Sequence, residues 1–116
     1  SGGGDEAVEK DGIRFVVMEA TGELKQMQNM VGELTRDAAK PTVAVVGSRE
    51  GGGKLIVAIT EGTIAAENHN AVEILNQIAG HIGGGGGGRP TFAQGGGSNS
   101  DGLDGALAAA KEIFGL

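Results

Sequence analysis

The sequence predicts an α/β fold, in which a small sheet of about three to five strands has helices packed on it. Short apolar runs of strand length alternate with longer stretches in which apolar residues recur every three or four positions. Only 3% of the residues are aromatic, so aliphatic side chains must build the core. The predicted order is strand, helix, hairpin, helix, glycine loop, helix.

The first predicted strand covers residues 13–20, which are β-branched and apolar and follow a turn at residues 11–12. A helix to about residue 38 should follow, with Thr21 as its N-cap, because apolar residues from Leu24 to Leu34 recur at helical spacing. Pro41 then closes the helical region. This part of the chain is therefore predicted to be a strand followed by a covering helix.

Two further strands are predicted at residues 42–47 and 54–60. The first is a nearly continuous apolar run, as expected for a strand covered on both faces. The glycine-rich turn at residues 50–53 separates the two runs by only a few residues. Together they indicate an antiparallel hairpin.

The second and third helices follow from their capping signals and apolar faces. Asn70 and Glu73 form an N-cap and capping-box pair, and apolar residues then continue to Ile82. Residues 91–94 are predicted to be a short edge strand. The last helix is expected to be capped by Ser100 or Asp101, with an apolar stripe that reaches Phe114.

The most unusual stretch is residues 83–97, GGGGGGRPTFAQGGG, in which nine of fifteen residues are glycine. Runs of glycine are often flexible linkers. This run lies between two amphipathic helices, which favours a loop held in place. Glycine also permits another backbone to come close, so a surface whose main-chain N–H groups face a ligand is the alternative to the linker.

Composition limits the class of protein. Nine Lys and Arg against fifteen Asp and Glu give a net charge of −6, so any nucleic-acid contact must be a local basic patch. There is no cysteine, and no apolar run approaches the roughly 18 to 20 residues that span a bilayer. We expect a cytoplasmic protein with no membrane contact, built from a flexible N-terminal segment or hinge remnant (residues 1–12) and one globular domain (residues 13–116).

Catalytic and metal-binding patterns are scarce. His69 and His81 are the only histidines, and they do not form a His-x3-His pair, so we do not expect a zinc site. The glycine run follows a helix and leads into a proline, whereas a dinucleotide-binding motif follows a strand and opens a helix. No Gly-Lys-Ser/Thr sequence completes a P-loop. The sequence therefore favours binding over catalysis.

Anion contact is the chemistry that remains. Consecutive main-chain N–H groups in a glycine turn form concave sites for phosphate oxygens, and Arg89 adds a permanently charged fork beside them. Arg49 and Lys54 extend this patch if the hairpin lies next to the loop; otherwise they are solvated surface cations. The candidate nucleic-acid-binding residues are Gly85, Gly86, Gly87, Gly88, Arg89, Gln94, Gly95, Gly96, Gly97, Lys54 and Arg49.

Residues 85–97, GGGGRPTFAQGGG, resemble the glycine-rich signature near the C-terminus of alanyl-tRNA synthetases, and the helix from Asn70 resembles the one that precedes it in that family. A similar module is the DHH-associated domain of single-strand-specific exonucleases and related phosphoesterases. Those proteins typically have histidine after the glycines, where this chain has Arg89 and Pro90. The resemblance thus favours the synthetase.

The resemblance implies a non-catalytic module of an alanine-tRNA ligase that contacts the tRNA elbow and supports aminoacylation and editing by other domains. The implied partners are alanine-specific tRNA, the other domains of the parent synthetase, and a second copy bound through upstream helices that this chain lacks. No cofactor is expected in this fragment, because ATP and zinc would belong to other domains. The alternatives are a dimerisation or protein-interaction module and the single-strand-binding domain of a phosphoesterase.

Overall fold

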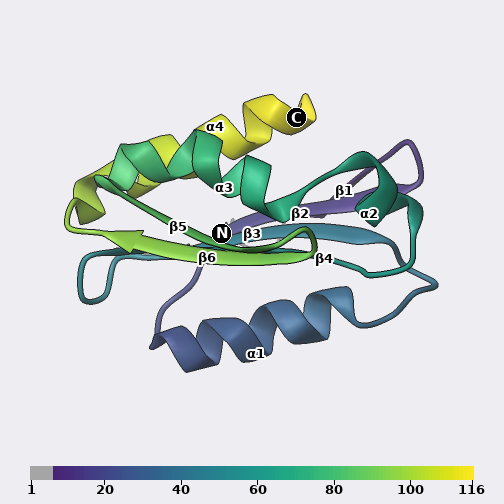
Figure 1. The fold of residues 1–116 in the computed structure, drawn as a ribbon, viewed down its shortest axis with the longest axis horizontal. Coiled ribbons are helices and arrows are strands. Elements are labelled where there is room, and N and C mark those ends of the chain that lie inside the picture. Colours follow the sequence, from purple (N-terminus) through teal and green to yellow (C-terminus); the bar gives the residue numbers. More distant parts are fainter. Residues whose placement is uncertain (1–6) are drawn as a thin grey trace.

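The computed structural model describes residues 7–116, so the predicted flexible segment lies outside it at residues 1–6. A six-stranded sheet lies between two helical layers, with α1 on one face and α3 and α4 on the other (Figure 1). The elements are β1 (Ala7–Lys10), β2 (Ile13–Glu19), α1 (Leu24–Thr35), β3 (Thr42–Ser48), β4 (Gly53–Ile59), α2 (Ile64–Asn68), α3 (Ala71–Ile78), the 3-10 helix η2 (Ala79–Ile82), β5 (Gly84–Arg89), β6 (Phe92–Gly97), the 3-10 helix η3 (Ser100–Gly102) and α4 (Leu103–Phe114).

The strand order is β1-β2-β3-β4-β6-β5, and only β2 and β3 are parallel. Helix α1 connects these two strands, because a parallel pair needs a crossover that a tight turn cannot supply. The α/β class, the helical layers and the central hairpin are as predicted. The predicted number of strands, three to five, was too low.

One additional strand is β1, whose residues we had included in the polar N-terminal segment. It pairs with β2 across a two-residue turn in which Asp11 and Gly12 both have positive φ, 56° and 81°. Such a turn matches the natural twist of a hairpin. All four residues of β1 are exposed, so backbone pairing forms this strand without the apolar pattern by which a strand is recognised.

Two separate cores hold the layers together. Strand β3 is buried along its whole length, and its side chains alternate between the two faces. Val43 and Val45 pack in the cluster under α3 and α4, whereas Ala44 and Val46 pack with Met27 of α1. The central strands are therefore covered on both sides, which explains their continuous apolar sequence.

The helix boundaries differ from the predictions in detail. The N-cap of α1 is Glu23, which forms a reciprocal capping box with Gln26, so the assignment to Thr21 was wrong. Helix α4 begins after η3, and its N-cap is Gly102 instead of Ser100 or Asp101. The Asn70 cap of α3 is confirmed: its side chain accepts hydrogen bonds from the N–H groups of Val72 and Glu73, at 2.9 and 3.1 Å.

The largest correction concerns the glycine loop, which is a β-hairpin. Strand β5 pairs with β6 along its whole length, from Gly84 opposite Gly97 to Arg89 opposite Phe92. Strand β6 also pairs with β4, so β5 is the edge strand and β6 is internal. Glycine has a low strand propensity, but here close approach requires it: a Cβ atom at Gly84, Gly86 or Gly88 would overlap the backbone of β6.

We predict opposite effects for neighbouring glycines of β5. Gly86→Ala should lower the free energy of unfolding by about 1–3 kcal/mol, because the new methyl group meets the Gln94 carbonyl and the backbone must shift. Gly87→Ala should change it by less than about 0.5 kcal/mol or raise it slightly, since its Cβ meets nothing within 4 Å. Urea unfolding followed by far-UV circular dichroism measures both, and equal losses would contradict this explanation.

Candidate nucleic-acid interface

The β5–β6 hairpin has two different faces. Phe92, Gln94 and Gly96 are paired with Ala58, Ile56 and Lys54 of β4, and Ile56 and Ala58 belong to the α1 core. The strand pairing places Gly85, Gly87 and Arg89 on this same face. Ideal Cβ atoms at Gly85 and Gly87 would meet nothing within 4 Å. The α1 face of the hairpin is therefore an open glycine surface that ends at Arg89.

The other predicted glycines are required by the fold. Gly86, Gly88, Gly95 and Gly97 lie on the alternate positions of the two strands, on the face toward α3. A Cβ at Gly95 would come within 2.5 Å of the Gly85 carbonyl oxygen, and one at Gly97 would overlap the Ile82 carbonyl. These four residues allow the backbones to pack closely and do not present an open surface.

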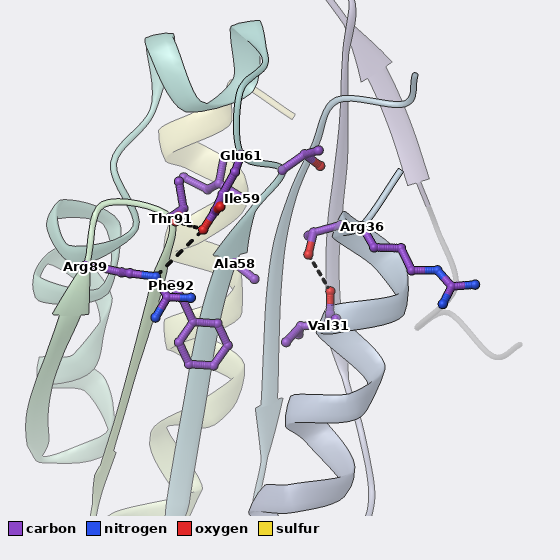
Figure 2. A pocket seen from close by; sticks show the side chains of 11 residues that line it. Val31, Arg36, Ala58, Ile59, Glu61, Arg89, Thr91 and Phe92 are labelled. Atoms are coloured by element: carbon purple, nitrogen blue, oxygen red, sulfur yellow. Dashed lines mark hydrogen bonds and ion pairs between the residues drawn. The ribbon is translucent and has the colours of Figure 1, made fainter. Parts of the chain in front are cut away.

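An open groove of about 310 Å³ lies between α1 and the Arg89 end of the hairpin (Figure 2). Val31 and Gly32 form the α1 wall, Ala58 of β4 lies at the base, and Phe92 of β6 forms the opposite wall. Arg89, Thr91 and Glu61 border the groove on the hairpin side. Arg36 also borders it, but its guanidinium points away from the groove in Figure 2 and pairs with Glu33 at 3.3 Å.

Arg89 is held loosely and is accessible. Its side chain is 66% exposed, and its Nε atom lies 3.8 Å from Glu61 Oε2. Its guanidinium carbon is 5.5 Å from the centre of the Phe92 ring, within the range of a cation–π contact. An exposed ion pair of this length contributes little to stability, so a phosphate can compete for Arg89.

Lys54 and Gln94 lie farther along the same face. Gln94 accepts a hydrogen bond from Gln28 Nε2 at 2.8 Å, which joins β6 to α1. Lys54 borders a second hollow of about 210 Å³ with Leu24, Gln94 and Gly96, and its ammonium group donates to the Glu50 carbonyl. Four strand positions, about 14 Å, separate Lys54 from the Arg89 end of the sheet. The two cations therefore mark opposite ends of one face.

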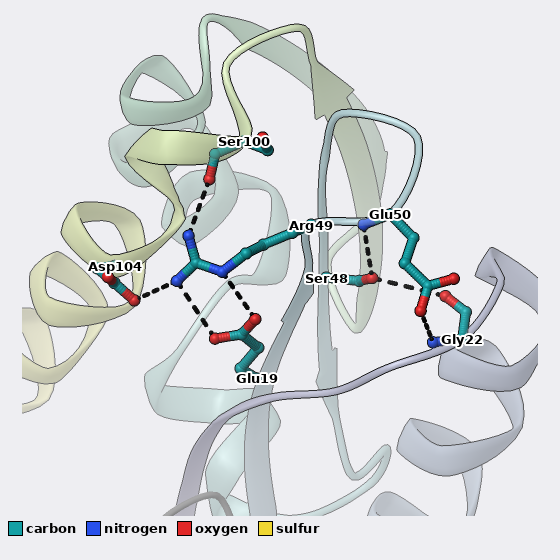
Figure 3. A network of polar contacts seen from close by, with 7 residues as sticks. All are labelled: Glu19, Gly22, Ser48, Arg49, Glu50, Ser100 and Asp104. Carbon is teal, nitrogen blue, oxygen red and sulfur yellow. Dashed lines mark hydrogen bonds and ion pairs between the residues drawn. The ribbon is translucent and has the colours of Figure 1, made fainter.

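Arg49 is not brought together with Arg89. It joins the end of β3 to the start of α4 by donating to Glu19 at 2.8 and 3.3 Å, to Asp104 at 2.5 Å and to the Ser100 carbonyl at 3.2 Å (Figure 3). The hydrogen bond to Glu19, followed by the charges of Glu19 and Asp104, raises the pKa of the Arg49 guanidinium. These contacts give Arg49 a structural role and leave it poorly placed for phosphate.

Known proteins match this chain in family and in fold. The DHHA1 domain family model matches residues 12–116. The chain belongs to this family. The crystal structure of the C-Ala domain from Aquifex aeolicus alanyl-tRNA synthetase superposes with a TM-score of 0.75 and 26% identity, covering 93% of this chain and 96% of that one. The predicted relation to the C-terminal domain of alanyl-tRNA synthetases is thereby confirmed.

Whole-protein relatives of this DHHA1 domain carry the name alanine–tRNA ligase. The Natronomonas pharaonis protein is 38% identical over 113 residues, which are 97% of this chain and 11% of that protein. The Chloroflexus aurantiacus protein is 32% identical over 103 residues, which are 89% of this chain and 12% of that protein. The chain thus spans about an eighth of the length of these relatives.

The two histidines of the DHHA1 domain lie in different environments. His69 follows α2 and packs edge-on against Phe15 and Phe114, with ring centres 5.3 and 5.7 Å apart. His81 lies in η2, where its backbone carbonyl accepts from Asn99. Within residues 7–116, no three His, Cys, Asp or Glu side chains are grouped to hold a metal ion, and no helix is long and apolar enough to cross a membrane.

Several residues of the groove were not predicted. Glu61 lies in a polar loop, and nothing in its sequence context places it beside Arg89. Gly32 lies within a helical pattern and was not singled out. A glycine inside a helix that no close packing requires indicates a possible functional position. Phe92, one of three phenylalanines, directly follows the Arg-Pro-Thr turn and was considered only as a strand residue. Long-range pairing brings these residues together.

We predict that His69 makes folding pH-dependent. Its partial burial between two phenylalanine rings lowers its pKa from the ordinary value of 6.5, so the folded state favours the neutral form. As the pH falls below about 6.5, the unfolded chain binds the proton first, and stability is lost until the pH passes the folded pKa.

Urea unfolding at pH 7.5 and pH 5.5 tests this prediction. The free energy of unfolding should fall by less in His69→Gln than in the wild type. An identical fall in both would assign the pH dependence to other groups.

Proposed function

We propose that this DHHA1 domain is a non-catalytic RNA-binding module of an alanine-tRNA ligase, contacting the elbow of alanine-specific tRNA. In this role it supports aminoacylation and editing by the other domains of its parent. The observation that carries the proposal is the open glycine face at Gly85 and Gly87, which internal packing does not require and which ends at an accessible arginine.

The physical basis is access to the backbone. Where side chains are absent, the ribose–phosphate chain of an RNA can lie close against β5 and reach the N–H groups at its free edge, which do not pair with β6 and can donate to phosphate oxygens. Arg89 supplies a planar, charged donor at the end of this surface. Such contacts recognise shape and backbone and do not read a base sequence, which suits a structured RNA surface such as a tRNA elbow.

The net charge of −6 sets the expected strength of this interaction. The domain as a whole repels a polyanion, because its Asp and Glu residues outnumber its Lys and Arg residues by 15 to 9. Affinity of the isolated domain should therefore be weak and depend strongly on salt. In the parent protein, contacts made by other domains would add to it through a high effective concentration.

We predict that Arg89→Glu weakens tRNA binding about tenfold at low salt. The loss of one phosphate contact should also reduce the slope of log affinity against log salt by about one. Lys111→Glu, an exposed change of the same charge on α4, is the matched control and should cost much less. Fluorescence anisotropy with alanine tRNA at two salt concentrations measures both variants, and equal affinities of wild type and Arg89→Glu would contradict the role of Arg89.

A second prediction separates binding from folding. Gly87→Val should weaken tRNA binding about tenfold because its side chain covers the open face, while the thermal unfolding temperature remains close to that of the wild type. Ile113→Val serves as a control at an exposed position on α4, which covers the sheet face opposite α1 (Figure 1). Wild-type affinity in Gly87→Val would mean that RNA does not contact this surface.

The principal alternative is a protein-interaction or dimerisation module. The favouring observation is that β5 is an exposed edge strand, and such strands readily pair with another chain. Sedimentation of the domain decides between them, because a stable dimer dissociated by Gly87→Val would assign the open face to a protein interface.

A single-strand-binding role, as in phosphoesterases, would use the same surface for a different RNA. A competition experiment tests this role. If the domain binds single strands, an unstructured oligonucleotide should displace tRNA at equal concentration.

A further inference from the structure

The groove beside Arg89 has features that phosphate binding does not explain. A phosphate needs donors, but Val31 and Gly32 on the α1 side and Phe92 opposite them offer no side-chain donor, and a carboxylate stands at the rim (Figure 2). With a volume of about 310 Å³, it lies at the small end of the range for ligand sites, roughly 300 to 1,000 Å³. This shape and size suit a single planar ring system.

The walls of the groove offer stacking surfaces. Phe92 is only partly buried and faces the groove from β6, with the Arg89 guanidinium over its ring at 5.5 Å from the centre. Unstacked bases are held in RNA-binding proteins by aromatic side chains and by arginine planes. On the opposite wall, Gly32 lies inside α1, where glycine is unfavourable, and its ideal Cβ meets nothing within 4 Å. The missing side chain keeps this wall open.

The carboxylate of Glu61 would select ligands that carry hydrogen-bond donors. Thr91 Oγ1 donates to its Oε2 atom at 3.0 Å, and Arg89 Nε lies 3.8 Å from the same oxygen. These contacts orient the carboxylate beside the groove, and each of its oxygens has two acceptor sites. A carboxylate beside a phosphate-binding arginine repels RNA unless it recognises donors on the ligand.

Guanine is the base that can donate two parallel hydrogen bonds to the two oxygens of a carboxylate. Its Watson–Crick edge presents the N1–H and the 2-amino group side by side, whereas adenine and cytosine present one amino group there and uracil one imino group. We infer that the groove binds an unpaired guanine of the RNA, stacked on Phe92, with Glu61 accepting from its Watson–Crick edge and Arg89 near its phosphate. This inference rests on the proposed RNA-binding function.

The test uses mononucleotides and the ¹⁵N-labelled chain, with amide shifts followed by NMR. Guanosine 5′-monophosphate should shift the amides of Gly32, Glu61 and Phe92 and bind at least about tenfold more tightly than inosine 5′-monophosphate, which lacks the 2-amino group. Adenosine and uridine monophosphates should bind no better than the inosine compound. Inorganic phosphate should shift the Arg89 region alone, which separates base binding from anion binding.

Variants assign the discrimination to Glu61. Glu61→Gln keeps the size of the side chain but removes one acceptor and the charge, so guanosine and inosine monophosphates should bind equally. Glu112→Gln, an exposed change on α4 across the sheet, should keep the tenfold preference. Equal binding of the two nucleotides to the wild type, or no shift around the groove, would overturn the guanine site. If alanine tRNA still binds through Arg89 in that case, the RNA-binding proposal stands alone; if tRNA does not bind either, the broader proposal fails as well.

Discussion

The position of β6 between β4 and β5 is the constraint on which the candidate site depends. Residues 92–97 form ladder hydrogen-bond pairs with β4 on one side and β5 on the other, so one short strand links the core hairpin to the glycine edge. Its Ala93 lies fully buried under the α3 layer, whereas Phe92 faces the α1 side. Without β6 in this position, β5 would have no strand to pair with. A run of glycine would then not form a strand, because glycine does not favour the extended conformation.

The pairing also divides the glycines into two classes. Strand geometry alternates the faces with a period of two, so every second glycine of β5 lies on the side where a Cβ would meet β6. The positions between them, Gly85 and Gly87, have free space on the outer side. One residue type therefore serves two purposes: close packing of the hairpin on one face and an unobstructed backbone on the other.

The sequence identified the layers well because they depend on local patterns. The central strands were visible in the apolar run before Gly47, and the Asn70 cap was visible in its spacing to Glu73. Of the β5–β6 hairpin, residues 91–94 were predicted as a strand, although at the edge of the sheet instead of inside it. Strand β5 was not predicted, because a run of glycine has no side-chain pattern and this strand exists only through its pairing with β6. For the same reason β1, exposed on every residue, was counted as a polar segment.

The residues of the candidate site also differ in whether local sequence could indicate them. Arg89 was proposed from its place after the glycines, but its neighbours Glu61 and Gly32 come from a loop and a helix that only the fold brings close. Arg49 was added to the patch around Arg89 on the condition that the central hairpin lies next to the glycine stretch. The position of Arg49 in the sequence does not show which carboxylates it meets. The arrangement of the strands and of α4 brings Glu19 and Asp104 to it.

The contrast between the two arginines explains how an acidic domain can present a usable positive charge. Arg49 has two carboxylates and a backbone carbonyl within 3.3 Å. Its charge is therefore neutralised by the contacts that join β3 to α4. Arg89 has one carboxylate at 3.8 Å and is 66% exposed, so its local field is only partly cancelled. At physiological salt, charges farther than about 8 Å are largely screened, so acidic residues beyond that distance contribute little at the groove. A net charge of −6 therefore weakens approach from a distance but does not prevent a short-range contact with phosphate at Arg89.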